Sequence, residues 1–299
     1  MTESLFDFFK KQDVEFYRSL NVAKISSIGI GGVCDFAFYP HNEKEFLTVL
    51  SFLENHKIKY FIAGRMTNVL FCCQRYDGVI VFTDKINRYS VAENKVSVGC
   101  GARFSTMLKR LSEISLGGCE ELYGIPGSVG GLVYNNAGAF GKSVSDCFCR
   151  AKLYSIDNNK LVTASLSDMN FSYRKSILQN KKHVLLSADF EFQRKDKAEI
   201  CDAFKSVITA RKNSQPYGAK SLGSIFKRSE GVPVSKLIDG AGLKGVRVGG
   251  AEISKKHAGF IVNAGGATSD DVLRLIELIK ERLYKEYGIV AEEEIELLK

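Results

Sequence analysis

The chain has 299 residues, of which 45% are hydrophobic and 25% are charged. This composition is typical of a globular protein and excludes an intrinsically disordered chain. The net charge of +8 is spread over scattered basic pairs such as Lys10-Lys11 and Lys181-Lys182, so it does not indicate a nucleic-acid partner.

Hydropathy and cysteine spacing exclude two further classes of protein. No apolar run reaches 18 residues and the N-terminus lacks a signal-peptide core, so we expect no membrane insertion and a cytoplasmic location. The eight cysteines form no C-x-x-C pair and have no histidine at zinc spacing. We therefore expect neither a metal site nor a disulfide framework, and free thiols fit a reducing compartment.

The N-terminal half alternates helical and extended patterns. A helix is predicted from Asn42, because the apolar residues that follow recur at helical spacing and Asn42 with Glu45 has capping-box spacing. Short apolar runs predict strands at 60–63, 79–82 and 96–98, and a second helical stripe begins at Phe104.

The C-terminal half continues the mixed pattern. Strands are predicted within 151–192, with Val184, Leu186, Ala188 and Phe190 on one face of the last. A domain boundary is placed near residue 195, and a helix that contains Ile200 and Ile208 is predicted after it. A long helix capped by Ser269 ends at Gly288, and a final strand is predicted over 289–298. The fold class is therefore α+β, with strands and helices partly segregated.

Glycine is concentrated at particular places. Six of the 27 glycines fall between Gly124 and Gly141, in the stretch GIPGSVGGLVYNNAGAFG. Turns of this kind leave backbone N–H groups accessible to an anion, although a tight loop packed between strands explains the same composition. A formal G-x-G-x-x-G match at Gly240, Gly242 and Gly245 is rejected as a dinucleotide site, because a helix precedes it and an extended stretch follows it.

Several motifs occur in one order along the chain. They are GIGG at 29–32, the glycine-rich stretch at 124–141, FSYRKS at 171–176, GSIFK at 223–227, KLIDGAGLKG at 236–245, GGAEISKKHAGFIVN at 249–263 and AEEEI at 291–295. Together they closely resemble the UDP-N-acetylenolpyruvoylglucosamine reductase family, from residue 26 to 296. The stretch between Arg174 and Ser224 is short, which resembles the subclass that lacks an extra substrate-clamping loop.

The resemblance implies a fold and an activity. The fold is a two-part FAD-binding region of the vanillyl-alcohol oxidase and p-cresol methylhydroxylase type, followed by an α+β substrate-binding domain. We expect an N-terminal extension at 1–20, the FAD-binding region at 21–195 with a split near 85–90, and the substrate domain at 196–299. The activity is NADPH-dependent reduction of UDP-N-acetylglucosamine enolpyruvate to UDP-N-acetylmuramate in peptidoglycan precursor synthesis, with FAD as the cofactor.

The resemblance also assigns residues. Catalytic roles fall on Arg174, on Ser224 as the proton donor, and on Glu294. Substrate contacts fall on Tyr173, Arg174, Lys227 and His257. Cofactor contacts fall on Ala63, Gly64, Arg65, Thr67, Asn68, Gly124, Pro126, Gly127, Ser128, Val129, Gly131, Asn136 and Gly138.

The chemistry of the reaction suits these residue types. Hydride addition builds negative charge toward the substrate carboxylate, which requires a positioned cation or donor and a proton source. The guanidinium of Arg174 matches a planar carboxylate, and Lys227 is the nearest candidate in sequence to stabilise the Ser224 alkoxide. In an extended strand Glu292, Glu294 and Glu296 would share one face. Without the motifs, each of these residues reads equally as a surface charge or a turn residue.

Two departures from the family pattern concern binding. Arg65 and Met66 stand where the family has two glycines in its first flavin loop, so Arg65 either pairs with the FAD pyrophosphate or obstructs the approach of the backbone to it. Arg228-Ser229 replaces the usual Asn-Pro after Lys227, which concerns the substrate phosphate. Two alternatives to the reductase therefore stay open: another flavin oxidoreductase of the same superfold, and a non-catalytic UDP-sugar-binding homologue. The expected partner is a small nucleotide sugar, and a monomer is the working expectation.

Overall fold

The computed structural model describes residues 8–299, which divide into two compact units. The first unit comprises the described residues up to Arg18, Phe36–Arg65 and Gly78–Ile208, and the second comprises Ser19–Asp35, Met66–Asp77 and Thr209–Lys299. Each unit has its own apolar core: two buried clusters belong to the first and one to the second. The described helices include none with the length and apolarity needed to span a membrane.

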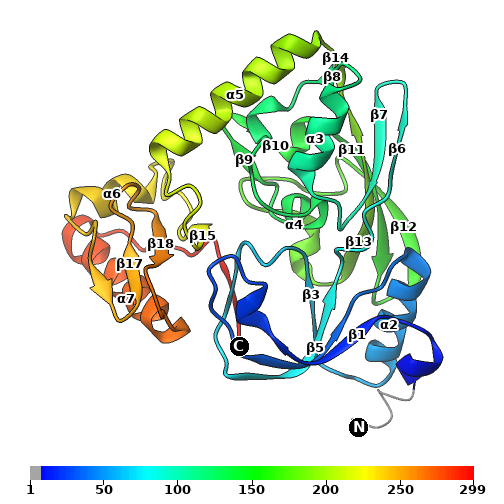
Figure 1. Cartoon of the computed structure of the whole chain (residues 1–299), viewed down its shortest axis with the longest axis horizontal. Helices are drawn as coiled ribbons and strands as arrows, with labels where there is room; N and C mark the ends of the chain where they lie inside the picture. The colour runs from blue at the N-terminus through cyan, green and yellow to red at the C-terminus, as the bar shows by residue number, and fades with distance from the viewer. Residues whose placement is uncertain (1–7) are drawn as a thin grey trace. The chain divides into compact units, whose positions relative to one another are not determined.

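The first unit is built on an antiparallel sheet with the strand order β12-β11-β13-β7-β6. The strands are β6 (Tyr89–Ala92), β7 (Lys95–Gly99), β11 (Phe148–Ser155), β12 (Lys160–Ser165) and β13 (His183–Glu191). The apolar stripe of α3 (Phe104–Ser112) and the buried side chains of α4 (Val129–Tyr134) share one core cluster with β7 and β13. Figure 1 shows both helices beside this sheet.

A second layer of the first unit packs around α2 (Glu43–Asn55). This helix begins as predicted at Asn42, whose side chain accepts a hydrogen bond from the Glu45 N–H at 3.0 Å. Its buried stripe contacts β3 (Tyr60–Ala63) and β5 (Arg75–Phe82), which pair in parallel. These strands belong to a sheet of order β1-β2-β5-β3, with β1 at Phe16–Asn21 and β2 at Val33–Phe38.

The prediction that four residues of β13 share one face was wrong. The pairing of β11 with β13 shifts register between Lys152 and Leu153, which leaves Leu186 as an extra residue. Val184 and Leu186 therefore join the core under α2, whereas Ala188 and Phe190 join the core under α3. Leu185 joins Ala188 and Phe190 in the core under α3, so the bulge changes which residues of β13 face each core.

Shorter elements complete the first unit. They are β8 (Leu116–Gly117), β9 (Gly138–Ala139), β10 (Lys142–Ser143), β14 (Gln193–Arg194) and the 3-10 helices Glu120–Leu122, Val144–Asp146 and Ile177–Asn180. A further 3-10 helix, Val22–Lys24, belongs to the second unit. The predicted turn at 157–159 joins β11 to β12. The first unit ends at Ile208 and the second resumes at Thr209, both within helix α5 (Lys197–Ser214). The functional domain limits expected from the sequence remain predictions.

The second unit contains an antiparallel sheet of order β15-β18-β17-β16. Its strands are β15 (Ser221–Ser224), β16 (Arg247–Val248), β17 (Ala251–Ile253) and β18 (Phe260–Asn263). The buried faces of α6 (Val234–Gly240) and α7 (Ser269–Tyr287) pack on it (Figure 1). The order of α6 before β16 and β17 confirms that the glycines at 240–245 form a turn after a helix.

The C-terminal segment differs from its prediction. Helix α7 ends at Gly288 in a left-handed conformation as predicted, but it is capped by Thr268 rather than Ser269. The strand expected over 289–298 is reduced to β19 (Glu296–Leu298), which pairs in parallel with β4 (Val69–Phe71). A bend at Ile295 separates β19 from a single antiparallel bridge between Glu293 and Phe226. The bend breaks the alternation that would place Glu292, Glu294 and Glu296 on one face.

Candidate active site

Two predicted cofactor segments of the first unit approach each other at Gly64 and Ser128. A methyl group added at Gly64 would lie 2.3 Å from the Ser128 Oγ, well inside the contact distance of two heavy atoms. Ser128 is 2% exposed and caps α4, where its Oγ accepts a hydrogen bond from the Gly131 N–H at 3.3 Å. Glycine is therefore required at residue 64 to bring the loop after β3 against the start of α4.

The glycine-rich stretch is a turn followed by a helix that the sequence did not predict. Gly124 and Gly127 take left-handed φ values of 82° and 143°, and α4 follows at once. Asn136, after the helix, is buried and fixes two neighbouring loops: its amide donates to the Ser172 carbonyl at 3.2 Å and its oxygen accepts from the Ser145 N–H at 3.0 Å. Of the other predicted cofactor residues of this stretch, Pro126 lies within the turn, Val129 and Gly131 lie in α4, and Gly138 begins β9.

These two segments fit a flavin dinucleotide. Its pyrophosphate is bound by backbone N–H groups where no side chain obstructs the approach. The close approach at Gly64 and the left-handed glycines at 124 and 127 provide two backbone-lined loops in one unit. FAD would be held by these loops.

Arg65 is engaged by another residue of the first unit. Its Nη1 donates to the Asp84 Oδ2 at 2.8 Å, and both side chains are about one quarter exposed (23% and 27%). The second carboxylate oxygen of Asp84 is buried and has no hydrogen-bond partner among residues 8–299. Burial raises the pKa of Asp84, and the Arg65 guanidinium opposes that rise. The guanidinium thus has a carboxylate partner of its own beside the cofactor loop.

The remaining residues of this loop lie at its two ends. Ala63 is buried at the end of β3, where its carbonyl accepts from the N–H of Thr83 at 2.9 Å. Thr67 and Asn68 precede β4. The side-chain amide of Asn68 donates to the backbone carbonyl of Glu294 at 3.0 Å, so the last residue of the predicted cofactor loop contacts a predicted catalytic residue.

Arg174 occupies the tip of a tight turn in the first unit. Ser172 and Lys175 exchange backbone hydrogen bonds at 3.2 and 3.1 Å, and Arg174 between them has a left-handed φ of 56°. Its guanidinium lies 5.2 Å from the ring centroid of Tyr173, which is 48% exposed. Non-glycine residues adopt this backbone conformation in only a few per cent of cases, so the turn must be held by its surroundings.

Ser224 and Glu294 lie on adjacent segments of the second unit. The Glu294 N–H donates to the Ile225 carbonyl at 2.7 Å, and the Lys227 N–H donates to the Glu292 carbonyl at 2.9 Å. These two bonds flank the bridge between Phe226 and Glu293, and they align GSIFK with AEEEI. The Ser224 Oγ donates to the Phe226 carbonyl at 3.2 Å. The structure therefore brings together two of the three predicted catalytic residues, while Arg174 belongs to the other unit.

Lys227 and His257, both in the second unit, are held by different interactions: an ion pair for Lys227 and a backbone hydrogen bond for His257. The ammonium group of Lys227 pairs with the Glu292 carboxylate, which is 72% exposed, rather than with Ser224. The His257 Nδ1 accepts from the Gly259 N–H at 3.2 Å, and burial lowers the pKa of the imidazole. Both facts favour a neutral ring whose Nε2 carries the proton.

Gln179 is a residue of this region that the sequence did not indicate. It lies in the 3-10 helix Ile177–Asn180 and donates to the Arg174 carbonyl at 2.9 Å and to the Tyr134 carbonyl at 3.3 Å. It therefore ties the Arg174 turn to the end of α4. A glutamine five residues after an arginine carries no spacing signal, so only the structure reveals this contact.

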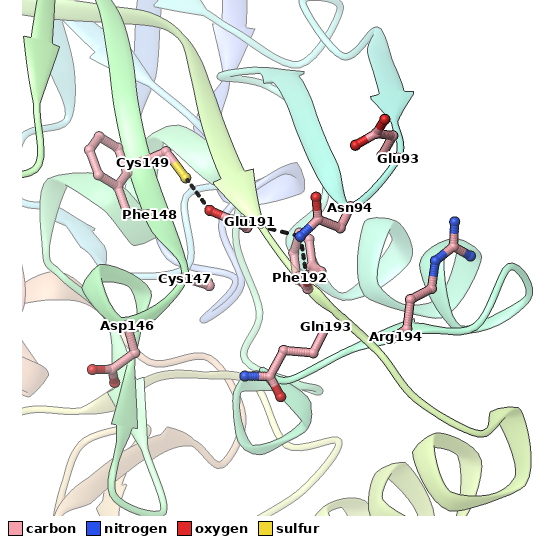
Figure 2. A pocket seen from close by; sticks show the side chains of 10 residues that line it. All are labelled: Glu93, Asn94, Asp146, Cys147, Phe148, Cys149, Glu191, Phe192, Gln193 and Arg194. Atoms are coloured by element: carbon pink, nitrogen blue, oxygen red, sulfur yellow. Dashed lines mark hydrogen bonds between the residues drawn. The ribbon is translucent and has the colours of Figure 1, made fainter.

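A cavity of about 660 Å³ in the first unit is lined by none of the predicted site residues. Figure 2 shows Glu191 at its centre, contacting Asn94 at 3.1 Å and the Cys149 thiol at 3.9 Å. Burial raises the pKa of Cys149, with Glu191 adding to the rise, so its thiol is not activated as a nucleophile. All eight cysteines are free thiols.

Two family models match separate parts of the chain. The FAD binding domain matches residues 34–165, and the C-terminal domain of UDP-N-acetylenolpyruvoylglucosamine reductase matches residues 215–298. The first match contains both backbone-lined loops around Gly64 and Ser128. The second contains Ser224, His257 and Glu294.

Relatives match over almost the full length. The UDP-N-acetylenolpyruvoylglucosamine reductase of Caldicellulosiruptor bescii is 37% identical over 97% of this chain and 93% of its own, and that of Pseudothermotoga lettingae is 40% identical over 91% and 94%. The crystal structure of the enzyme from Thermus caldophilus superposes with a TM-score of 0.81 and 27% identity, covering 96% of this chain and 99% of that one. The chain belongs to the UDP-N-acetylenolpyruvoylglucosamine reductase family, whose members are FAD-dependent oxidoreductases of peptidoglycan synthesis.

Proposed function

We propose that the chain reduces the enolpyruvyl ether of UDP-N-acetylglucosamine to UDP-N-acetylmuramate with NADPH as the electron donor. Membership of the family supports the reductase activity, and the FAD binding domain at 34–165 supports the cofactor. We expect the reaction in the cytoplasm, because the eight cysteines are free thiols.

The reaction consumes one NADPH and one proton. When bound, FAD supplies hydride transfer between NADPH and the methylene carbon of the enolpyruvyl group. The neighbouring carbon, which bears the carboxylate, then needs a proton. The residues of the chain must therefore stabilise an enolate-like charge and deliver that proton.

Arg174 is proposed to hold the substrate carboxylate. Its guanidinium presents a planar fork of donors that matches a carboxylate with two parallel hydrogen bonds. The left-handed backbone of Arg174 and the two carbonyl-bound amides of Gln179 and Asn136 fix the turn before substrate arrives. A fixed cation stabilises developing charge without the cost of reorganising it.

Ser224 and Glu294 are proposed to form the proton-delivery pair. The observation that carries this proposal is the 2.7 Å hydrogen bond from the Glu294 N–H to the Ile225 carbonyl, because it joins the AEEEI motif at Glu294 to the GSIFK motif at the residue that follows Ser224. Ser224 delivers its proton to the carbon next to the carboxylate. Glu294 is the nearest predicted acid–base group on the paired segment, and it orients the hydroxyl or returns the proton.

The nucleotide-sugar part of the substrate is proposed to contact three further residues. Tyr173 is half-exposed beside Arg174 and presents a ring that can stack on or cover the ligand. Lys227 offers an ammonium group to a phosphate if it exchanges its exposed partner Glu292. His257, with a neutral ring, offers a single N–H donor rather than a charge.

The test is a substrate-dependent assay on the purified chain with FAD. We expect a visible flavin absorption band and NADPH oxidation with UDP-N-acetylglucosamine enolpyruvate. The matched control is UDP-N-acetylglucosamine, which has the same nucleotide sugar but no enolpyruvyl group and should give no oxidation. NADPH oxidation that is the same with both sugars, or absent with both, would overturn the proposal.

A further inference from the structure

Asn68 closes a gap in the backbone pairing of the C-terminal segment. The parallel ladder between β4 and β19 begins at Val69 opposite Glu296, and the Asn68 carbonyl accepts the Glu296 N–H at 2.9 Å. One step earlier the bend at Ile295 turns the chain out of register. The Asn68 side chain reaches across this bend to donate to the Glu294 carbonyl at 3.0 Å.

Both backbone polar groups of Glu294 are thereby fixed. Its N–H donates to Ile225, next to Ser224, and its carbonyl accepts from the Asn68 amide. The two peptide units that flank the Glu294 Cα are each held by a hydrogen bond, and this limits where the Glu294 carboxylate can point. The partners come from two segments of the second unit that are remote in sequence from residue 294.

We propose that Asn68 is a positioning residue for Glu294, and this inference rests on the proposed function. Asn68 ends the predicted cofactor loop, and a resemblance alone assigns it only to FAD. The amide contact gives Asn68 a second role: it ties the end of the predicted cofactor loop to the segment that carries the Glu294 carboxylate. Loss of the amide donor should let the Glu294 segment move, while Ser224 stays in place in β15.

The first arm of the test measures backbone protection. Asn68→Ala removes the amide donor, and Asn68→Asp removes the donor while keeping the size and the side-chain oxygen. We expect faster hydrogen–deuterium exchange over residues 289–299 in both variants, in the protein with FAD bound. This readout does not depend on activity.

The matched control is Asn94→Ala. Asn94 makes the same type of contact in the first unit: its amide donates to the Phe192 carbonyl at 3.2 Å, and its own carbonyl accepts the Phe192 N–H at 2.9 Å (Figure 2). Asn94→Ala should speed exchange near residue 192 and leave residues 289–299 and turnover unchanged. It therefore measures how much the loss of such an amide changes exchange and turnover when the contact is not to Glu294.

The second arm is a double-mutant cycle with Glu294→Gln. We expect Asn68→Ala to slow reoxidation of the pre-reduced flavin by the enolpyruvyl substrate roughly tenfold, with the rate of flavin reduction by NADPH unchanged within about twofold. In the Glu294→Gln background, Asn68→Ala should lower the rate of flavin reoxidation by less than about twofold, because the carboxylate that Asn68 positions is gone. A general structural defect would instead lower both half-reactions and would add to the Glu294→Gln effect.

The outcomes separate this inference from the proposed function. Normal exchange over residues 289–299, or rate losses that are additive with Glu294→Gln, would overturn the role of Asn68 while leaving the reductase proposal intact. A lower FAD affinity with normal reoxidation of the loaded enzyme would show a cofactor role only, and would also overturn it. Absence of turnover in the wild-type chain would overturn the proposed function and this inference with it. If Asn68→Ala does not fold, Asn68→Asp decides between these outcomes.

Discussion

The side-chain amide of Gln179 donates to the backbone carbonyl of Arg174 at 2.9 Å, at the tip of the turn where Arg174 has a left-handed φ of 56°. A non-glycine residue pays roughly 1 kcal/mol or more for this conformation, so the turn persists because its surroundings hold it. Gln179 uses its second amide hydrogen on Tyr134, at the end of α4. The predicted catalytic arginine is thus supported by α4, the helix within the glycine-rich cofactor segment.

Gln179→Ala should lower the catalytic efficiency with the nucleotide sugar. Loss of the amide hydrogen bonds to the Arg174 and Tyr134 carbonyls frees the Arg174 turn, and we expect kcat/KM for the enolpyruvyl substrate to fall roughly tenfold, which corresponds to about 1.4 kcal/mol. Steady-state kinetics with both substrates checks this. Gln193→Ala is the control, because Gln193 is exposed. Equal kinetic constants for the two variants would contradict the role of Gln179.

Gly64→Ala should lower both thermal stability and flavin content. The added Cβ would lie 2.3 Å from the Ser128 Oγ, so the loop or the start of α4 must shift. The expected cost is about 1–3 kcal/mol, measured as a lower Tm of the FAD-free protein. Gly131→Ala is the control for stability, since its Cβ would lie 3.6 Å from the same oxygen, an ordinary contact. The double change Gly64→Ala with Ser128→Ala should recover part of the loss, and no recovery would show that the clash is not the cause.

His257 should make the protein less stable in acid. Burial lowers its pKa in the folded state below the ordinary value of about 6.5, so the unfolded chain binds more protons between the two values. Its contribution to stability is therefore full above pH 6.5 or so and is lost as the pH falls toward the folded pKa. Urea unfolding at several pH values should show a steeper fall in the free energy of unfolding for the wild type than for His257→Asn. Identical slopes for the two proteins would contradict a buried neutral ring.

Substitutions of Lys227 and of Glu292 should differ in their effect on KM for the nucleotide sugar, although the two side chains form an ion pair. Glu292 is 72% exposed, so Glu292→Gln should change the free energy of unfolding by less than about 1 kcal/mol and leave KM for the nucleotide sugar near the wild-type value. Lys227→Met should raise that KM roughly tenfold if its ammonium group binds a phosphate. Both variants are compared in one steady-state assay. A rise in KM that is equal in the two variants would indicate that the pair acts only as a structural contact.

The sequence was informative where local signals are strong. Capping at Asn42, the stop at Gly288 and the apolar stripes of α2, α3 and α7 predicted helices that the structure confirms. Helix α4 was missed because glycines interrupt its apolar pattern, and glycine favours turns over helix interiors. The bulge in β13 and the bend at Ile295 were missed because each depends on a partner strand that is remote in sequence.

The site was predictable as a set of residues but not as a set of contacts. Motif order marked Ser224 and Glu294, and only the bridge at Phe226 and Glu293 shows that their segments pair. The partners of Arg65, Arg174 and Glu294 lie 5 to 226 residues away and follow no periodic spacing. Side-chain hydrogen bonds to remote carbonyls depend on tertiary packing, which a single sequence does not encode in any local pattern.

The most direct test of the proposed mechanism is the rate of each half-reaction in Ser224→Ala. The flavin is reduced anaerobically with NADPH in one mixing experiment, and the reduced protein is mixed with UDP-N-acetylglucosamine enolpyruvate in a second, with the visible flavin band as the signal in both. We expect reduction at the wild-type rate and reoxidation slowed by roughly a hundredfold or more, because only the second half-reaction needs the Ser224 proton. Reoxidation at the wild-type rate, or a loss confined to the NADPH step, would contradict the assignment of Ser224 as the proton donor.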